Sequence, residues 1–121
     1  MKKILIVDDE PNIITALSFL FEQSGYEVQT AFNGEAALKK LAYFEPNVIV
    51  LDVMMPVMDG FETALRIRKN LIWDDIPIVF LTAKGTQQDK LMGYKSGGEY
   101  YISKPFDNQQ LLNIIADIMM D

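Results

Sequence analysis

The sequence predicts a single α/β domain in which five parallel strands form one sheet with helices packed on both faces. Apolar runs rich in β-branched residues alternate five times with segments of helical periodicity, without a repeat or a low-complexity linker. The run 48–51 is apolar throughout, which is typical of a strand buried on both faces of a parallel sheet. Since 121 residues can bury a sizeable core, we expect one domain over residues 1–121.

The bulk composition excludes several classes of protein. The chain is 50% hydrophobic, which is typical of a globular protein and not of a disordered one. No apolar run approaches the ~20 residues that span a bilayer, and acids interrupt the apolar run 4–7 too early for a signal peptide. Because the net charge is −6, we expect no direct binding to nucleic acid, and no membrane partner. With no targeting segment and no Cys, a cytoplasmic protein is expected; the absence of His excludes His-based catalysis and His metal sites.

The first half of the chain predicts three strands and two helices. Residues 4–7 form the first strand, and Pro11 suits the first turn of a helix that stops at Gly25. Residues 26–31 alternate in character and form the second strand. A short helix follows Asn33-Gly34, and the third strand begins after Pro46 and ends at Asp52.

The second half predicts two further strands and three helices. Asp59 caps a helix that runs to about Leu71, and Glu62 three residues later completes a capping box. The remaining elements are a strand at 78–82, a helix from about 86 to 97, a strand at roughly 99–103 and a last helix capped by Asp107. A single crossover helix between strands predicts right-handed crossovers and the flavodoxin-like, doubly wound strand order 2-1-3-4-5.

This order brings acids together at one edge of the sheet. Asp8 and Asp9 follow the first strand and Asp52 ends the third, and these strands are predicted neighbours. Packed carboxylates repel unless a cation compensates, so we expect Mg²⁺, or Mn²⁺ in its place, among these oxygens. Thr82 ends the fourth strand and would add a hydroxyl, and Lys104 follows the fifth strand and would add a positive charge. Acids, metal, lysine and hydroxyl together favour phosphoryl transfer, with Asp52 as nucleophile.

Five segments then point to a known family: Ile6–Glu10, Val50–Pro56, Asp59-Gly60, Leu81–Ala83 and Tyr101–Phe106. In order and spacing they resemble the receiver domain of two-component response regulators, over the whole chain. The resemblance implies that Asp52 is the phosphorylated residue and that Asp9 and Asp52 bind Mg²⁺ directly. It also implies that Asp8 acts through water and that the backbone carbonyl of Met54 is a further ligand.

The same resemblance implies how the remaining residues act. Thr82 and Lys104 would contact the phosphoryl group, and the Lys104–Pro105 peptide bond would be cis. Tyr101 matches the aromatic switch residue, which rotates when Thr82 moves toward the new oxygens. The surface of the fourth helix, fifth strand and fifth helix would then change and control an output protein or a fused output domain. The donor would be a phosphohistidine of a sensor histidine kinase or a histidine phosphotransfer protein. Such a receiver catalyses only its own phosphorylation and dephosphorylation and is not a conventional enzyme.

Three alternatives share parts of this pattern. An FMN-binding flavodoxin needs a Gly- and hydroxyl-rich phosphate loop, whereas residues 8–11 here are acidic. A haloacid-dehalogenase-like phosphatase carries a second Asp two residues after its nucleophile, and position 54 is Met. A pseudo-receiver, which binds partners without phosphorylation, usually loses an acid or the lysine, and this chain keeps them all.

The sequence departs from the family in three places. Glu99 and Tyr100 stand where two acids are common, and Gly93 weakens the predicted fourth helix by ~1 kcal/mol relative to Ala. The last helix, within 107–121, contains no Lys or Arg. Regulators that dimerise through this face to bind DNA typically use basic residues there, so we do not expect that dimer.

Overall fold

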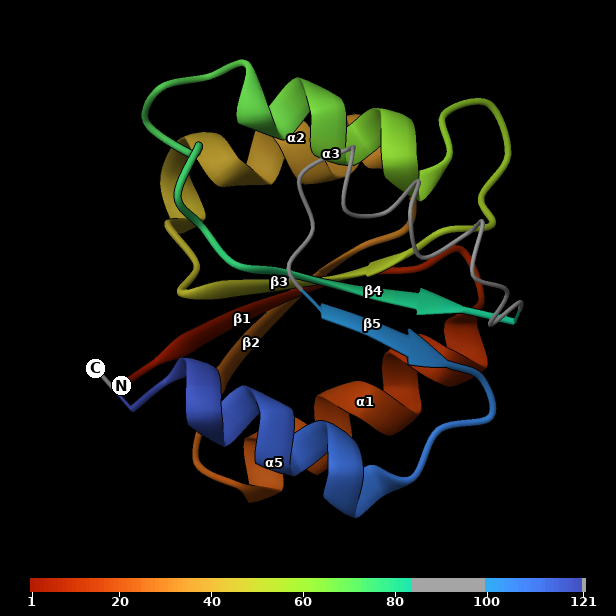
Figure 1. Ribbon diagram of the computed structural model, residues 1–121, viewed down its shortest axis with the longest axis vertical. Helices are drawn as coiled ribbons and strands as arrows, with labels where there is room; N and C mark the ends of the chain where they lie inside the picture. Colours follow the sequence, from red (N-terminus) through yellow and green to blue (C-terminus); the bar gives the residue numbers. More distant parts are fainter. Residues whose placement is uncertain (84–99, 121) are drawn as a thin grey trace.

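The structure, a computed structural model that describes residues 1–83 and 100–120, is a parallel sheet between two layers of helices (Figure 1). The five strands lie in the order β2-β1-β3-β4-β5, and every neighbouring pair is parallel. Their bounds are β1 Lys3–Val7, β2 Glu27–Ala31, β3 Val48–Asp52, β4 Ile78–Thr82 and β5 Tyr100–Ser103. The predicted fold class and strand order are therefore confirmed.

Helices cover both faces of this sheet. Their bounds are α1 Pro11–Gln23, α2 Gly34–Phe44, α3 Gly60–Arg68 and α5 Asn108–Ile118. Figure 1 shows α2 and α3 on one face and α1 and α5 on the other. The helix predicted from about 86 to 97, with Gly93 inside it, lies outside the described residues.

The three inner strands are apolar because both of their faces pack against helices. Successive side chains point to opposite faces of the sheet, so one set joins the layer of α2 and α3 and the alternate set joins the layer of α1 and α5. In β3, for example, Ile49 and Leu51 belong to the first core, whereas Val48 and Val50 belong to the second. Each fully buried aliphatic side chain contributes about 1.5–3 kcal/mol to folding.

Side-chain caps fix where the helices begin. Asn33 Oδ1 accepts a hydrogen bond from the Ala36 N–H at 2.7 Å, and Asp59 Oδ1 accepts one from the Glu62 N–H at 2.8 Å. The capping role of Asp59 is thus confirmed. The Glu62 carboxylate, in contrast, accepts a hydrogen bond at 3.3 Å from Arg66 one turn further along α3.

Two predicted boundaries need correction. Helix α3 ends at Arg68 and not near Leu71, because the Asn70 side chain accepts a hydrogen bond from the Ile72 N–H at 2.9 Å and favours a turn. Strand β2 begins at Glu27 and not at Tyr26, because the Tyr26 N–H bonds back to the Phe21 carbonyl at 3.1 Å. Gly25 lies between α1 and β2 and adopts a φ of 92°, a left-handed conformation that ends the helix.

Among the helices of the described part of the chain, none has both the length and the apolar character that crossing a bilayer requires.

Candidate functional site

The site lies at the carboxyl ends of the strands, where the residue after β1, β3 and β5 donates one further backbone hydrogen bond to the neighbouring strand. The Asp8 N–H donates to the Ala31 carbonyl at 3.1 Å, and the Val53 N–H donates to the Leu81 carbonyl at 2.9 Å. The Lys104 N–H donates to the Thr82 carbonyl in the same way. The backbones of the site residues are therefore extensions of the sheet and not free loops.

Four carboxylates meet at this edge. Asp8, Asp9, Glu10 and Asp52 each offer an oxygen, and these four atoms lie within 4.8 Å of one another. Asp8 and Asp52 are 0% and 2% exposed, Asp9 is half-buried, and Glu10 is exposed at the mouth. The structure thus brings together the acids of β1 and β3, as the sequence predicted.

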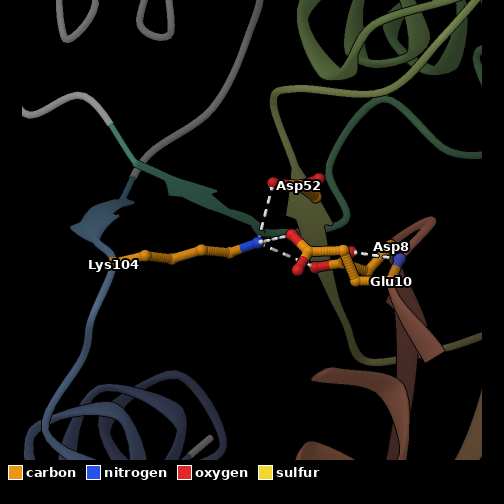
Figure 2. Close-up of polar contacts among 4 residues, drawn as sticks. All are labelled: Asp8, Glu10, Asp52 and Lys104. Carbon is orange, nitrogen blue, oxygen red and sulfur yellow. Dashed lines mark hydrogen bonds and ion pairs between the residues drawn. The ribbon is translucent and has the colours of Figure 1, made fainter. Parts of the chain in front are cut away.

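Lys104 reaches across the sheet edge into this cluster (Figure 2). Its ammonium contacts three carboxylates: Asp8 Oδ2 at 3.1 Å, Asp52 Oδ1 at 3.1 Å and Glu10 Oε1 at 3.4 Å. Because the side chain of Lys104 is only 14% exposed, water screens these contacts less than it screens a surface ion pair. Lys104 is therefore the cation that stabilises the packed acids.

The positive charge of Lys104 does not fully compensate for the burial of the Asp8 and Asp52 carboxylates. Burial and, after it, the charge of Asp8 raise the pKa of Asp52 from 3.8 to about 6, although the charge and the hydrogen bond of Lys104 lower it. Burial also raises the pKa of Asp8, against the opposing hydrogen bonds from the Glu10 N–H and Lys104. Burial lowers the pKa of Lys104, but its contacts with Asp8 and Asp52 raise it by more, so the lysine stays charged.

Within the part of the chain that the structure describes, one buried side-chain oxygen has no hydrogen-bond partner. Asp52 Oδ2 finds no hydrogen-bond donor among residues 1–83 and 100–120, whereas Asp52 Oδ1 bonds to Lys104. An unpartnered buried carboxylate oxygen is costly, and hard divalent cations prefer oxygen ligands of this kind. The residues present therefore fit a divalent cation at Asp52, with Asp8, Asp9 and Glu10 around it.

Gly60 allows the start of α3 to lie close to the backbone of Asp52. The Gly60 N–H donates to the Val53 carbonyl at 2.9 Å, which closes the loop 53–60. A Cβ at position 60 would lie 2.3 Å from the Asp52 carbonyl oxygen and 2.9 Å from the Val53 Cα. Since both are backbone atoms and cannot rotate away, only glycine allows this approach.

The other predicted residues take different places around the cluster. Thr82 is buried at the end of β4, and the Lys104–Pro105 peptide bond is cis, as the resemblance implied. Met54 lies in the loop that follows Asp52, and its side chain is 58% exposed. Tyr101 lies outside the acid cluster, half-buried in β5, with its ring centroid 6.3 Å from that of Phe80.

Two residues of the site were not predicted from the sequence. Glu10 belonged to the predicted segment Ile6–Glu10 without a role of its own, and its contact with Lys104, 94 positions away, was not expected. The approach of Gly60 to the Asp52 backbone was also missed. A signal for Glu10 was present, because a third acid directly follows the acid pair and precedes the helix that starts at Pro11.

Comparisons with known proteins identify the family. The sequence profile of the response regulator receiver domain matches residues 4–116. The alkaline phosphatase synthesis transcriptional regulatory protein PhoP of Bacillus subtilis is 46% identical over 110 residues, which are 91% of this chain and 45% of PhoP. The DNA-binding dual master transcriptional regulator RpaA of Synechocystis is 41% identical over 112 residues, 93% of this chain and 46% of RpaA. The chain thus spans a little under half the length of these two relatives.

Solved structures agree with this result. The chemotaxis protein CheY4 of Vibrio cholerae superposes with a TM-score of 0.94 at 35% identity, over 98% of this chain and 99% of CheY4. A putative response regulator of Chloroflexus aurantiacus gives 0.93 at 32% identity, over 99% and 98% of the two chains. With the matched fold and the acid cluster in place, the chain belongs to the family of receiver domains of two-component response regulators.

Proposed function

We propose that Asp52 is the residue on which this receiver is phosphorylated, in a divalent-cation-dependent reaction. The observation that carries the proposal is the buried Asp52 Oδ2, which has no partner in the described part of the chain and lies beside three further acids and a lysine. Of the two fully buried acids, Asp8 uses both of its oxygens, one toward the Glu10 N–H and one toward Lys104. Asp52 alone of this pair has an oxygen available for bond formation.

The reaction is a transfer between two proteins. An oxygen of Asp52 attacks phosphorus in a phosphohistidine of the partner, and the phosphorus–nitrogen bond breaks with its electron pair on the imidazole. The imidazole leaves neutral when its other ring nitrogen carries a proton. Hydrolysis of the acyl phosphate by water later releases inorganic phosphate and restores the Asp52 carboxylate. Residues 1–121 contain no His, so the donor histidine would lie outside them, in a sensor histidine kinase or a histidine phosphotransfer protein.

We assign the metal to the acid cluster. Asp9 and Asp52 would hold Mg²⁺ or Mn²⁺ directly, Asp8 through water, and the Met54 carbonyl would be a further ligand. When bound, the metal neutralises charge on the acids and on the transferring phosphoryl oxygens. Lys104 would leave Asp52 Oδ1 and bind a phosphoryl oxygen, and the Thr82 hydroxyl would donate to another.

The signal would travel through the packing of β4 and β5. Thr82 and Tyr101 lie on these paired strands, and the Tyr101 ring packs at a tilt of 51° against Phe80 of β4. A Thr82 side chain drawn toward the phosphoryl group would leave space that the Tyr101 ring can enter. The altered surface of β5 and α5, with the segment before them, would then act on an output protein or a fused output domain.

The output is proposed from the relatives. PhoP and RpaA are described as transcriptional regulators, and RpaA as DNA-binding. Because this chain spans less than half of each, DNA binding would belong to a part outside the matched domain or to a partner. The receiver itself would act as a switch and turn over only its own phosphoryl group.

Intact-mass spectrometry tests the proposal. The protein is incubated with acetyl phosphate, with and without Mg²⁺, as wild type, Asp52→Asn and Asp59→Asn. We expect one phosphoryl adduct in wild type and in Asp59→Asn, both only with Mg²⁺, and none in Asp52→Asn. Asp59→Asn is the matched control, because Asn caps α3 as well as Asp does. An adduct that persists in Asp52→Asn would overturn the assignment, and the absence of any adduct would favour a pseudo-receiver.

A further inference from the structure

Glu10 uses its backbone and its side chain for different purposes. Its N–H donates to Asp8 Oδ1 at 2.9 Å, and its carbonyl accepts hydrogen bonds from the first turn of α1 at 3.1 Å. It occupies the N-cap position of α1, yet its side chain makes no capping hydrogen bond. The carboxylate instead reaches the Lys104 ammonium at 3.4 Å (Figure 2). The side chain is therefore available for a role in the site.

The contact with Glu10 stabilises the Lys104 ammonium in its position among the carboxylates. The ammonium bonds to Asp8 Oδ2 and Asp52 Oδ1, on two of the carboxylates that would surround a bound cation. An ammonium and a divalent cation repel each other at such distances, so Lys104 has to give up contacts before a metal occupies the cluster. The Glu10 carboxylate is a third partner of the Lys104 ammonium, so it favours the metal-free arrangement in which the lysine remains in the cluster.

We propose that Glu10 is a positioning residue that acts through Lys104: it holds the ammonium across the acid cluster and thereby opposes Mg²⁺ binding. This inference rests on the proposed function, since it concerns access of Mg²⁺ to Asp52. The exposed carboxylate at the mouth, and not only the buried acids, then sets the Mg²⁺ concentration at which the receiver becomes competent for phosphorylation.

The charge of Glu10 acts in the opposite direction and has to be separated from its contact. Its carboxylate lies within 4.8 Å of the other three acids and attracts any cation that approaches them. Glu10→Asp keeps this charge but withdraws the carboxylate from Lys104 by one methylene group. Glu10→Gln removes the charge. Asp is also a favourable N-cap, so Glu10→Asp is not expected to weaken α1.

Isothermal titration calorimetry of Mg²⁺ into the metal-free protein tests the inference. Glu10→Asp and Glu10→Gln are each made in wild type and in Lys104→Met, with far-UV circular dichroism to verify folding. We expect Glu10→Asp to bind Mg²⁺ about two- to fivefold more tightly than wild type, the range for an ion pair with one exposed partner. In the Lys104→Met background the same change has no contact to remove, so it leaves the affinity unchanged. We expect Glu10→Gln to lower the Mg²⁺ affinity by a larger factor in the Lys104→Met background than in the wild-type background.

The outcomes separate this inference from the proposed function. Unchanged or weaker binding by Glu10→Asp overturns the inference and leaves the metal site intact. Equal tightening in both backgrounds also overturns it, because Glu10 would then act on the metal directly and not through Lys104. A wild-type protein that binds no Mg²⁺, although Asp52 is phosphorylated, overturns the inference together with the proposed metal site.

Discussion

Neutralising Asp52 should stabilise the metal-free domain near neutral pH. Burial raises the folded-state pKa of this carboxyl from 3.8 to about 6, so the folded protein resists its ionisation. Asp52→Asn keeps the shape of the side chain and removes the charge. A shift of about two units corresponds to about 3 kcal/mol, and we expect Asp52→Asn to raise the free energy of unfolding by up to this amount at pH 8.

The sign of the pH dependence follows from the raised pKa. Below 3.8 the Asp52 carboxyl is protonated in both states, and its contribution to stability is fully present. As the pH rises toward about 6, the carboxyl ionises in the unfolded chain first, which favours unfolding. Above about 6 both states are ionised, and the lost stability stays constant. The advantage of Asp52→Asn should therefore be near zero at pH 4, grow through pH 6 and level off.

Urea unfolding in the presence of EDTA measures this effect, with fluorescence of the single tryptophan, Trp73, and far-UV circular dichroism as probes. Asp75→Asn is the control, because Asp75 is an exposed acid in the loop that precedes the amino end of β4, whereas the acid cluster lies at the carboxyl ends of the strands. A Mg²⁺ titration should then stabilise wild type more than Asp52→Asn. The reasoning is refuted if Asp52→Asn is less stable than wild type at pH 8, or if the difference does not change with pH.

Two further substitutions test how the site is held. Gly60→Ala should cost about 1–3 kcal/mol in urea unfolding and slow phosphorylation of Asp52, because the new Cβ would meet the Asp52 carbonyl. Gly34→Ala is the comparison for the phosphorylation rate, since its Cβ would meet the Thr63 and Met58 side chains and not the Asp52 backbone. A rate of adduct formation that falls equally in both variants would contradict the special role of Gly60. Asp107→Ala should destabilise the domain by about 1 kcal/mol in thermal melts and Asp107→Asn by much less, since the Asp107 side chain caps α5 through the N–H groups at 109 and 110; equal losses in both variants would count against the cap.

Local sequence patterns were sufficient to predict the strands and their order in the sheet. The continuous apolar run at 48–51 predicted a strand covered on both faces, and the structure places alternate residues of that run in two separate cores. The order of strands followed from the helix-sized crossovers, and it placed Asp8 and Asp52 on neighbouring strands. The boundaries failed where side chains compete with the backbone, as Asn70 does beyond the end of α3.

Contacts between side chains or loops that are far apart in the sequence could not be predicted from local sequence patterns. Nothing in the local pattern around Glu10 indicates that its carboxylate reaches a lysine 94 positions away, since this depends on the reach of two side chains at one strand edge. The Gly60 contact likewise requires the path of the loop 53–60 relative to Asp52, which propensities do not give. The sequence therefore predicted which residues meet but not which contacts hold them.

The energetics of the site link its stability to its function. Asp8 and Asp52 are buried where their charges repel, and Lys104 satisfies both acids but leaves Asp52 Oδ2 without a donor among the described residues. The metal-free domain is thus less stable than it would be with a neutral side chain at position 52. A divalent cation that binds there relieves part of this cost, and its affinity includes the relief. Because the Lys104 ammonium contacts Asp8 and the other oxygen of Asp52, it repels that cation, and the affinity also depends on how firmly the lysine is held. The unfavourable burial of Asp52 and the hold on Lys104 therefore act in opposite directions on metal binding, and the balance between them sets how readily Asp52 becomes available for phosphorylation.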